Sequence, residues 1–240
     1  MERPKPSRVL LKLSGEAFAG EEAFGLDPKT VHYIAEEIVS VHDAGIQSAI
    51  VVGGGNFLRG EEFSREAGIN QSVADTMGMV STIMNALALQ EAIEKLGVPT
   101  RVMSAISIQQ VCEPFIRRRA IRHLEKGRIV ILAAGTGNPF FTTDTAAVLR
   151  ALELGADVLI KATKVDGVYD KDPHIYKDAS KFEYITFSDA IRLRLGVMDQ
   201  TAFTMCHEHN LPVVVLSLFQ KGTLRAAALG ENVGTLVGGG

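Results

Sequence analysis

Short, unbroken apolar runs alternate along the chain with longer segments in which apolar residues recur every three to four positions. The short runs are too brief for buried helices and predict strands that are covered on both faces. They lie at residues 8–13, 46–52, 98–103, 129–132, 157–160, 211–216 and 234–237. Because strands and helices alternate, the pattern predicts an α/β fold with a mostly parallel central sheet.

The periodic segments predict helices with recognisable ends. They lie at residues 28–44, 73–96, 146–154, 187–195, 200–209 and 223–229. The first has Asp27 as an N-cap and Pro28 at its first position, and Gly45 ends it. A further helix, starting at Pro114, carries four arginines that predict a solvated face rather than a nucleic-acid patch.

The helix predicted at 73–96 differs from the others because its apolar residues cover two sides. Met77, Val80, Met84 and Leu87 form one side, and Met79, Ile83, Ala86 and Ile93 form another. A helix that is apolar on two sides is buried on both, either under other elements or at a subunit interface. Asp75 falls in its predicted first turn, where the helix dipole favours an acid. That position alone can explain Asp75, and a role in ligand binding is the alternative.

The stretch from 128 to 147 has the strongest local signal for a binding site. A buried strand ends in small residues, a loop follows at 136–139, and a helix is predicted to begin near Thr145. Thr142, Thr143 and Asp144 offer N-cap oxygens. In open parallel sheets, ligands bind beyond the carboxyl ends of strands, where Asp144 can work with a cation or a lysine. The alternative is an ordinary tight strand-to-helix connection.

Two further strand ends carry residues suited to phosphate. Gly53, Gly54 and Gly55 directly follow the second strand and predict close approach of the backbone to a ligand, with Arg59 available as a phosphate-binding fork. No Gly-Lys-Ser/Thr follows, and Leu58 stands where a dinucleotide fingerprint needs its third glycine, so neither of those loops is present. Lys12, near the end of the first strand, is either a mobile cation over the next loop or an edge-strand solubility lysine.

Length and charge narrow the class of protein. The 240 residues fit one α/β domain, residues 1–240, whose approximate lobes span 1–155 and 156–240. A net charge of −3 argues against a dedicated nucleic-acid binder. Cys112 and Cys206 lie too far apart in sequence to indicate a disulfide framework or a zinc site. With no signal-peptide core and no window near the ~18 apolar residues of a membrane span, a cytoplasmic protein without membrane association is expected.

Five motifs occur in an informative order: KLSGEAF at 12–18, GGGNFLRG at 53–60, GTGNPFFTTDTAA at 135–147, KATKVDGVYDKDP at 161–173 and MDQTAF at 198–203. Together they resemble the amino-acid-kinase superfamily over essentially the whole chain. GTGNPFFTTD is specific to the uridylate-kinase branch. The resemblance implies a three-layer α/β/α sandwich that transfers the γ-phosphoryl group of ATP to UMP. It also implies Mg²⁺ with ATP (no direct protein ligand is assigned), a homohexamer, activation by GTP and inhibition by UTP.

The resemblance also implies roles for individual residues. Lys12, Arg59 and Asp144 match catalytic positions, with Asp144 organising the catalytic lysines. ATP contacts match Lys12, Leu13, Ser14, Gly15, Gly55, Arg59, Thr163, Tyr169 and Asp172. UMP contacts match Gly54, Asp75, Thr136, Gly137, Asn138, Pro139, Phe140, Phe141, Thr142 and Thr143. The GTP region matches Gly20, Glu21, Glu22, Ala23, Phe24 and Gly25.

The physical demands of phosphoryl transfer agree with these residue types. The reaction needs aligned donor and acceptor and screening of negative charge, and an acceptor phosphate that is already ionised needs no protein base. Lysine, arginine, glycine-loop amides and a metal ion are suitable countercharges. Two alternatives stay open: a carboxylate or carbamate kinase of the same superfamily, and a non-enzymatic nucleotide-binding regulator. The regulator is disfavoured because Lys12 and Asp144 are both present.

Overall fold

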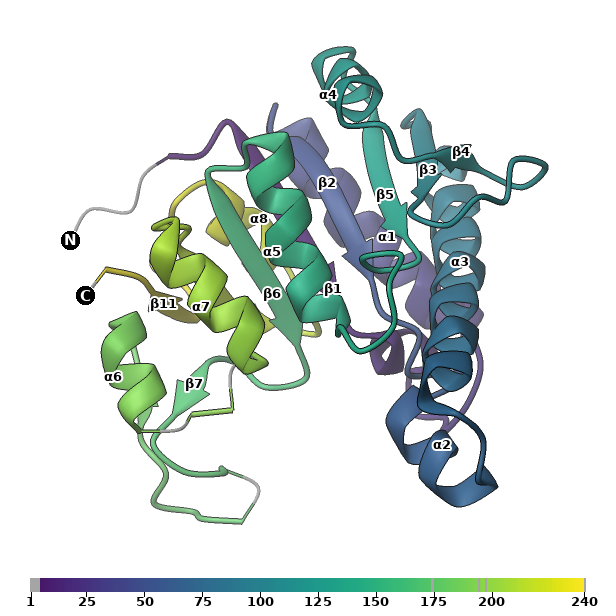
Figure 1. Cartoon of the computed structure of the whole chain (residues 1–240). Helices are drawn as coiled ribbons and strands as arrows, with labels where there is room; N and C mark the ends of the chain where they lie inside the picture. Colours follow the sequence, from purple (N-terminus) through teal and green to yellow (C-terminus); the bar gives the residue numbers. More distant parts are fainter. Residues whose placement is uncertain (1–4, 174, 194, 197, 240) are drawn as a thin grey trace.

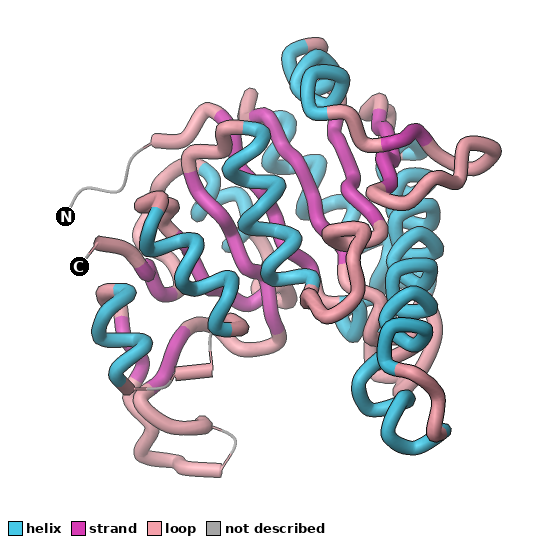
Figure 2. The backbone as a smooth tube through the Cα atoms, viewed as in Figure 1, coloured by secondary structure: helices cyan, strands magenta, loops and turns pink. Residues whose placement is uncertain are grey.

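The computed structural model describes residues 5–173, 175–193, 195–196 and 198–239. Within these residues, nine strands form one central sheet in the order β4-β3-β5-β2-β1-β6-β10-β11-β9 (Figures 1 and 2). The strands are β1 (Arg8–Leu13), β2 (Gln47–Val52), β3 (Thr100–Ser104), β4 (Glu113–Pro114), β5 (Ile129–Ala133), β6 (Val158–Thr163), β9 (Tyr184–Ile185), β10 (Val213–Ser217) and β11 (Thr235–Val237). A separate two-stranded ribbon joins β7 (Val168–Tyr169) to β8 (Lys181–Phe182).

The sheet is parallel from β4 to β10, as the alternation of strands and helices predicts. Among the described strands of this sheet, only β10 and β11 pair in antiparallel fashion. β1 lies in the middle, paired with β2 on one side and β6 on the other. Its apolar side chains are therefore buried on both faces, which explains why its sequence shows no alternation with polar residues.

Helices cover both faces of the sheet, so the expected three-layer α/β/α sandwich is confirmed (Figure 1). The helices are α1 (Pro28–Asp43), α2 (Gly60–Ala67), α3 (Gln71–Lys95), α4 (Arg117–Glu125), α5 (Thr143–Leu154), α6 (Phe187–Arg192), α7 (Gln200–Glu208) and α8 (Thr223–Ala228), with a 3₁₀ turn at Gly15–Ala19. The apolar residues of α1, α3 and α8 pack on one face. Those of α4, α5, α6 and α7 pack on the other.

Two helices begin earlier than their apolar pattern predicts, because polar residues cap them. Asn70 caps α3 by accepting a hydrogen bond from the backbone of Ser72, so the helix starts at Gln71. Asp75 therefore lies in the second turn, and the prediction of a first-turn acid is wrong. Thr142 caps α5, which starts at Thr143 rather than near Thr145. Such caps are worth roughly 0.5–2 kcal/mol of stability.

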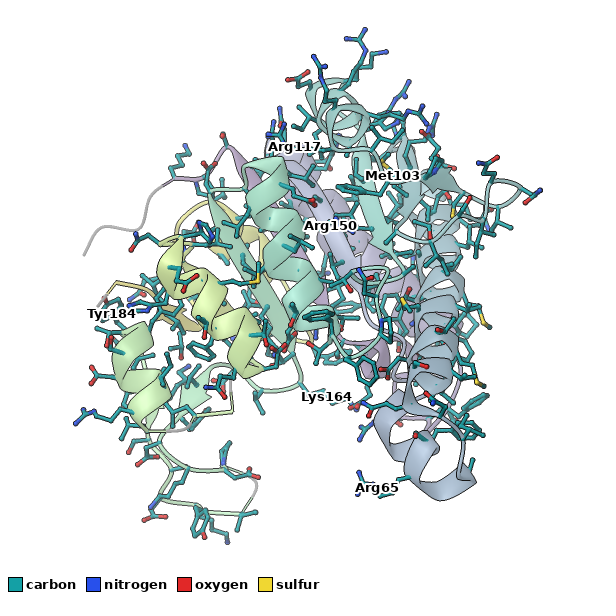
Figure 3. All side chains as sticks on the ribbon, viewed as in Figure 1. Arg65, Met103, Arg117, Arg150, Lys164 and Tyr184 are labelled. Atoms are coloured by element: carbon teal, nitrogen blue, oxygen red, sulfur yellow. The ribbon has the colours of Figure 1, made fainter. Side chains whose placement is uncertain are left out.

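The basic segment around α4 is also different from its prediction. Pro114 belongs to β4, and the helix begins only at Arg117. β4 is an edge strand, where a proline is tolerated because its missing N–H is not needed for pairing. The residue before a proline also avoids helical geometry, so Glu113 favours the extended conformation that is observed. The arginines of α4 are exposed as expected. Arg117, which Figure 3 labels, donates to the backbone carbonyl of Glu153 at the end of α5.

Several small elements have no clear pattern in the sequence. These are α2 and the two-residue strands β4, β7, β8 and β9. The segment predicted as a helix at 187–195 is helical only at Phe187–Arg192, and residue 194 lies outside the described residues. None of the described helices has the length and apolar character needed to cross a bilayer.

One side of α3 is not covered by the other residues that the structure describes. Ile83, Leu89 and Ile93 are buried against the sheet, but Met77 and Met84 are 41% and 47% exposed. Val73 and Val80 complete this line of exposed apolar side chains, which we call the α3 stripe (Val73, Met77, Val80 and Met84). Of the predicted side, Leu87 packs against the core, but Met77, Val80 and Met84 are exposed. Burial of these three residues by other elements of the same chain is therefore wrong, and the subunit-interface alternative stays open.

Candidate active site

Three charged side chains from separate elements meet above the middle of the sheet. Lys12 and Lys161 are paired residues on the neighbouring strands β1 and β6, so their side chains leave the sheet on the same face. Asp144, in the first turn of α5, lies between them. Its Oδ1 is 2.7 Å from Lys12 Nζ, and its Oδ2 accepts a hydrogen bond of 2.6 Å from Lys161 Nζ. The edge-strand interpretation of Lys12 is wrong because β1 is central and Lys12 is buried.

Burial and charge set the ionisation of this cluster. Burial opposes ionisation of Asp144, but the two ammonium groups outweigh it and hold the pKa of the carboxyl below its ordinary value. Burial lowers the pKa of Lys161, assisted by the neighbouring Lys12 charge, although the Asp144 carboxylate opposes this shift. The result is a preformed site in which two lysine side chains converge on the Asp144 carboxylate, and the charge of Asp199 also acts on Lys161.

The N-terminus of α5 is fixed by a network of hydroxyl groups. Thr142 Oγ1 accepts hydrogen bonds from the backbone N–H groups of Asp144 (3.0 Å) and Thr145 (3.3 Å). Both threonines donate their hydroxyl protons to the carboxylate of Asp199, which also caps α7 by accepting from Ala202 N at 2.9 Å. Asp199 thus ties the ends of two helices to the position of Asp144.

Two members of this cluster received no specific role from the sequence. Lys161 opens the motif at 161–173, and Asp199 belongs to the motif at 198–203. The available signal for Lys161 is that it directly follows the apolar run at 157–160, because a lysine that continues a buried strand needs a charged partner. Asp199 carried a weaker signal, as an acid directly before a helix.

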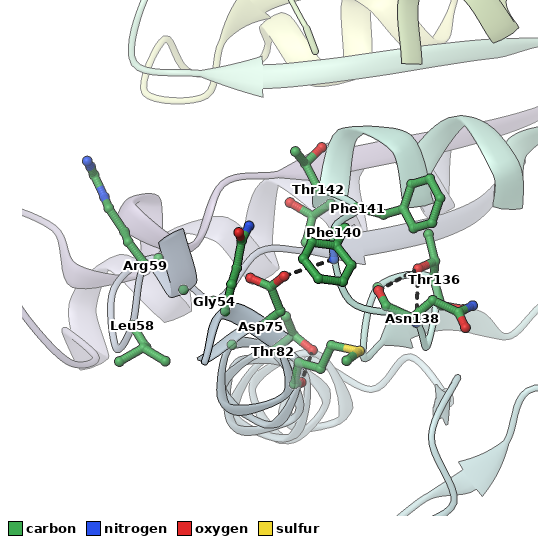
Figure 4. Close-up of a pocket in the computed structure, with 17 residues that line it drawn as sticks. Gly54, Leu58, Arg59, Asp75, Thr82, Thr136, Asn138, Phe140, Phe141 and Thr142 are labelled. Carbon is green, nitrogen blue, oxygen red and sulfur yellow. Dashed lines mark hydrogen bonds between the residues drawn. The ribbon is translucent and has the colours of Figure 1, made fainter. Parts of the chain in front are cut away.

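A cavity of about 410 Å³ opens beside this cluster, between α3 and the loop after β5 (Figure 4). We call it the α3 cavity. It brings together many of the residues expected to contact UMP: Gly54, Asp75, Thr136, Asn138, Phe140, Phe141, Thr142 and Thr143. Gly137 and Pro139 belong to the same loop but not to its lining; Gly137 packs against the Ala105 carbonyl.

The loop beside the α3 cavity is held in an unusual backbone conformation by α3. Phe140 has φ of 69°, in the left-handed region that phenylalanine rarely adopts. Its N–H donates to Asp75 Oδ2 at 2.8 Å, as Figure 4 shows. Ala134, at φ of 61°, is held in the same way because its N–H donates to Thr82 Oγ1 at 2.6 Å. Asp75 is therefore a structural partner of the loop as well as a cavity-lining carboxylate.

The glycines after β2 serve backbone packing more than the sequence suggests. A side chain at Gly53 would meet the backbone of Gly15 at 2.6 Å, and one at Gly54 would meet the Gly78 carbonyl of α3 at 2.8 Å. Gly15 in turn lies against the Gly54–Gly55 peptide. Only Gly55 has room around it, and it lines the α3 cavity. Neighbouring backbone therefore accounts for Gly53 and Gly54, and close approach of a ligand stays a prediction for Gly55.

Arg59 and Gly55, which the resemblance assigns to ATP, lie at the same cavity as Asp75. Both line the α3 cavity, and Arg59 is ion-paired with Glu16. In Figure 4 the Arg59 side chain extends away from the Asp75–Phe140 pair. Leu13 is fully buried at the end of β1 and packs in the hydrophobic core.

A second cavity, of about 580 Å³, lies on the other side of Lys161; we call it the β6 cavity. It gathers Thr163, Tyr169 and Asp172, the residues expected around adenosine. The Tyr169 hydroxyl donates to Asp166 Oδ1 at 2.6 Å, which fixes its ring at the cavity wall. Lys161 lines this cavity while its ammonium group reaches Asp144, which directly follows the Thr143 of the α3 cavity.

A third cavity, of about 710 Å³, lies beside the start of α1; we call it the α1 cavity. Gly20, Glu21 and Glu22 line it together with Lys29, Lys164 and Phe219. The rest of the 20–25 loop points elsewhere. Phe24 packs edge-on against Phe57, with ring centroids 5.6 Å apart. The Gly25 carbonyl accepts a hydrogen bond from the side chain of Asn56.

Protein ligands for a metal ion are not clustered in the described part of the chain. No group of three or more histidine, cysteine, aspartate or glutamate side chains comes together there. A divalent cation that entered this site would need most of its oxygen ligands from a bound substrate or from water.

Comparison with known proteins gives a consistent result over the whole chain. The profile of the amino acid kinase family matches residues 7–217. A uridylate kinase from Dichelobacter nodosus is 53% identical over 237 residues, covering 98% of both chains. The UMP kinase from Bacillus anthracis superposes with a TM-score of 0.95 at 40% identity, covering 98% of this chain and 97% of that one. The UMP kinase from Ureaplasma parvum gives 0.90 at 34% identity, covering 97% and 98%.

Proposed function

This chain belongs to the amino acid kinase family, and we propose on that premise that it transfers the γ-phosphoryl group of ATP to UMP, giving UDP and ADP. The reaction is a step of pyrimidine nucleotide synthesis. The observation that carries the proposal is the Lys12–Asp144–Lys161 cluster between two cavities of nucleotide size. Phosphoryl transfer needs positively charged groups between donor and acceptor, and the side chains of Lys12 and Lys161 can supply them there.

The two lysines are proposed to act on the transferred phosphoryl group. Asp144 draws the ammonium groups of Lys12 and Lys161 to one point and compensates their mutual repulsion. Charge on the transferred group spreads over its equatorial oxygens in the transition state, where fixed ammonium groups stabilise it without reorganisation. The UMP phosphate needs no general base, because it is ionised at neutral pH.

We assign UMP to the α3 cavity and the adenosine of ATP to the β6 cavity. The α3 cavity is lined by residues between 54 and 143, and the β6 cavity by residues between 161 and 215. This division supports the proposed lobes, 1–155 on the UMP side and 156–240 on the ATP side. Arg59 and Gly55, at the rim of the α3 cavity, are proposed to reach the ATP phosphates from the UMP side.

Magnesium is proposed to enter as its complex with ATP. The residues present fit that mode, because the described chain offers lysines and backbone amides at the site and no cluster of metal ligands. Bound there, the ion would neutralise phosphate charge. Asp144 is committed to Lys12 and Lys161, so it is proposed as an organiser of cations rather than as a metal ligand.

Regulation and assembly form the finer part of the proposal. The 20–25 loop contributes to the α1 cavity, where Lys29 and Lys164 suit phosphates and Phe219 suits a base; this supports GTP as an activator. UTP, the triphosphate with the same base as UMP, is proposed as an inhibitor. The exposed α3 stripe supports assembly, proposed as a homohexamer. A cytoplasmic location is proposed because the chain belongs to the amino acid kinase family.

Acceptor choice tests the proposed function most directly. ADP formation is measured with ATP-Mg²⁺ and UMP, CMP, acetylglutamate, aspartate or carbamate as separate acceptors, with and without GTP. We expect UMP to be the preferred acceptor. Preference for a carboxylate or carbamate would replace the proposal with the other kinases of the family. No ADP formation with any acceptor, while nucleotide still binds, would favour a nucleotide-binding regulator.

Asp75 is proposed to read the ribose of UMP. An ionised carboxylate accepts strongly from a hydroxyl group, and a site built for that bond loses on the order of 1–3 kcal/mol when the hydroxyl is missing. dUMP should therefore be a markedly poorer substrate than UMP, and Asp75→Ala should narrow the gap mainly by weakening UMP. Equal kcat/KM for the two nucleotides, or a full preference in Asp75→Ala, would leave Asp75 only its bond to Phe140.

A further inference from the structure

A pair of buried asparagines joins α3 to the loop after β2. Asn56 follows the three glycines, and Asn85 lies on the inner side of α3; the two side chains are 2% and 0% exposed. Asn56 Nδ2 donates to Asn85 Oδ1 at 2.9 Å, and Asn85 Nδ2 donates to Asn56 Oδ1 at 2.7 Å. The two amides therefore form a closed, reciprocal pair away from water.

The second N–H of each amide reaches a different loop. Asn85 Nδ2 also donates to the Gly53 carbonyl at 2.7 Å, and Asn56 Nδ2 also donates to the Gly25 carbonyl at 2.7 Å. The Gly25 N–H returns a bond of 2.9 Å to the backbone carbonyl of Asn56. Because a primary amide has two N–H donors, all four donors of the pair are used and neither side chain can rotate without losing bonds.

The pair thus connects three parts of the molecule that carry different functions. α3 contributes Asp75 and Thr82 to the α3 cavity. The loop after β2 contributes Gly54 and Gly55 to the same cavity. Through Gly25 the pair holds the end of the 20–25 loop, whose first residues line the α1 cavity. A fully bonded buried network fixes one geometry, and a change at one member is felt by the others.

We propose that Asn56 and Asn85 are positioning residues that couple occupancy of the α3 cavity to the conformation of the 20–25 loop. UMP in contact with Gly54 constrains the glycine loop that leads into Asn56, and Asn56 passes that constraint to Gly25. By reciprocity, a ligand that orders the 20–25 loop favours the nucleotide-binding arrangement of the glycine loop. The inference rests on the proposed function, because UMP is the ligand assigned to the α3 cavity.

Amide hydrogen exchange of residues 20–27, measured on the full chain with and without UMP, tests the coupling. In the unmodified protein, UMP should slow exchange in this segment. In Asn85→Ala the slowing should shrink at least fivefold, although the described hydrogen bonds of Asn85 go to Asn56 and Gly53 and not to this segment. KM for UMP should rise at least fivefold. Asn56→Asp should also lose the slowing, because it retains an acceptor for Asn85 and loses the donor to Gly25.

Gln90→Ala is the matched control. Gln90 lies on the same helix, and its side-chain amide also donates a hydrogen bond to a backbone carbonyl. The acceptor is Thr100 at 3.2 Å, away from both loops. The substitution should lower stability without changing KM for UMP or the exchange response. The same rise of KM in Gln90→Ala would reduce the asparagines to a structural role.

Calorimetric titration of the unmodified protein separates the two levels of the proposal. UMP binding without any change of exchange at 20–27 would overturn the coupling and leave the proposed function intact. Failure to bind UMP would overturn both. If Asn85→Ala does not fold, retention of the full exchange response in Asn56→Asp would still overturn the coupling.

Discussion

Asp144 is a carboxylate whose two oxygens serve two different lysines, one from each neighbouring strand of the sheet centre. Removing its charge would leave two buried ammonium groups facing each other. Removing Lys12 would leave Asp144 paired with Lys161 alone. The two changes disturb the site in opposite electrostatic senses, and both should leave the transferred phosphoryl group poorly stabilised.

We expect Lys12→Ala and Asp144→Asn each to lower kcat by about 100-fold or more, which is roughly 2.7 kcal/mol of transition-state stabilisation, with the protein still folded. Steady-state ADP formation and circular dichroism measure the two quantities. Lys126→Ala, which removes a lysine exposed after α4, should behave as the unmodified enzyme. Near-normal turnover in either cluster variant would exclude that residue from the mechanism.

The ionisation of the cluster predicts the pH profile. Because the pKa of Asp144 lies below its ordinary value of about 4, the carboxylate stays charged through the neutral range. Because burial lowers the pKa of Lys161, its ammonium group deprotonates at lower pH than an ordinary lysine. kcat should therefore fall as pH rises through this lowered pKa.

Lys161→Arg checks this assignment, because a guanidinium group stays protonated beyond the range of the assay. In the Lys161→Arg enzyme, the alkaline fall of kcat should move to higher pH or vanish. An alkaline limb at the same pH in Lys161→Arg would assign it to another group.

At the scale of elements, α3 controls the conformation of the loop after β5. Thr82 accepts the N–H of Ala134, which is fully buried and lies in the left-handed region. A buried N–H without a partner costs about 1–3 kcal/mol. Thr82→Val, which keeps the shape and removes the acceptor, should lower the free energy of unfolding by that amount and raise KM for UMP.

Thr82→Ser is the control, because it keeps the hydroxyl and loses only a methyl group. It should retain most of the stability and the KM of the unmodified protein. Denaturant unfolding and UMP titration provide both numbers. An unchanged unfolding free energy in Thr82→Val would show that Ala134 finds another acceptor.

The elements also show what the sequence can and cannot predict. The apolar runs located the central strands, and Asp27 correctly marked the start of α1 because it accepts from Lys29 and Thr30 of the first turn. The start of α3 was missed because the apolar pattern begins at Val73, while the cap is the polar Asn70. Strands of two residues, such as β9, exist only through pairing with distant segments, here β11, which local patterns do not encode.

The site was predictable where a motif is local and incomplete where it depends on strand order. The GTGNPFFTTD stretch identified the loop and Asp144 directly from its residues. The pairing of Lys12 with Lys161 depends on β1 lying beside β6, which no short pattern specifies. The left-handed Phe140 is likewise invisible in sequence, because its conformation depends on a bond to Asp75 on another element.

At the scale of the whole molecule, the α3 stripe is an apolar surface that the described residues of a single chain leave exposed. Its four apolar residues recur at spacings of three and four, so they lie along one side of the helix. Met84→Glu should yield a smaller species than the unmodified protein in light scattering at micromolar concentration, because a charge would be buried in the interface. A monomeric unmodified protein would contradict the proposed assembly.

Ile191→Glu provides the control for that prediction. Ile191 is an exposed apolar residue of comparable accessibility, 43%, on α6 rather than on the α3 stripe. Its substitution should leave the size of the assembly unchanged. Dissociation by Ile191→Glu as well would mean that added negative charge, rather than the α3 stripe, determines the result.

The central position of β1 also has a consequence for synthesis of the chain. β1 is made first, but β6, its partner on one side, follows about 150 residues later. At roughly 5–20 residues per second, the ribosome needs about 8–30 s to supply that partner. During this time the strand carrying Lys12 has an unpaired apolar edge, open to other nascent chains and to chaperones. Among the described strand pairs, β1 and β6, which bring the two lysines together, are thus also separated by the longest interval during synthesis.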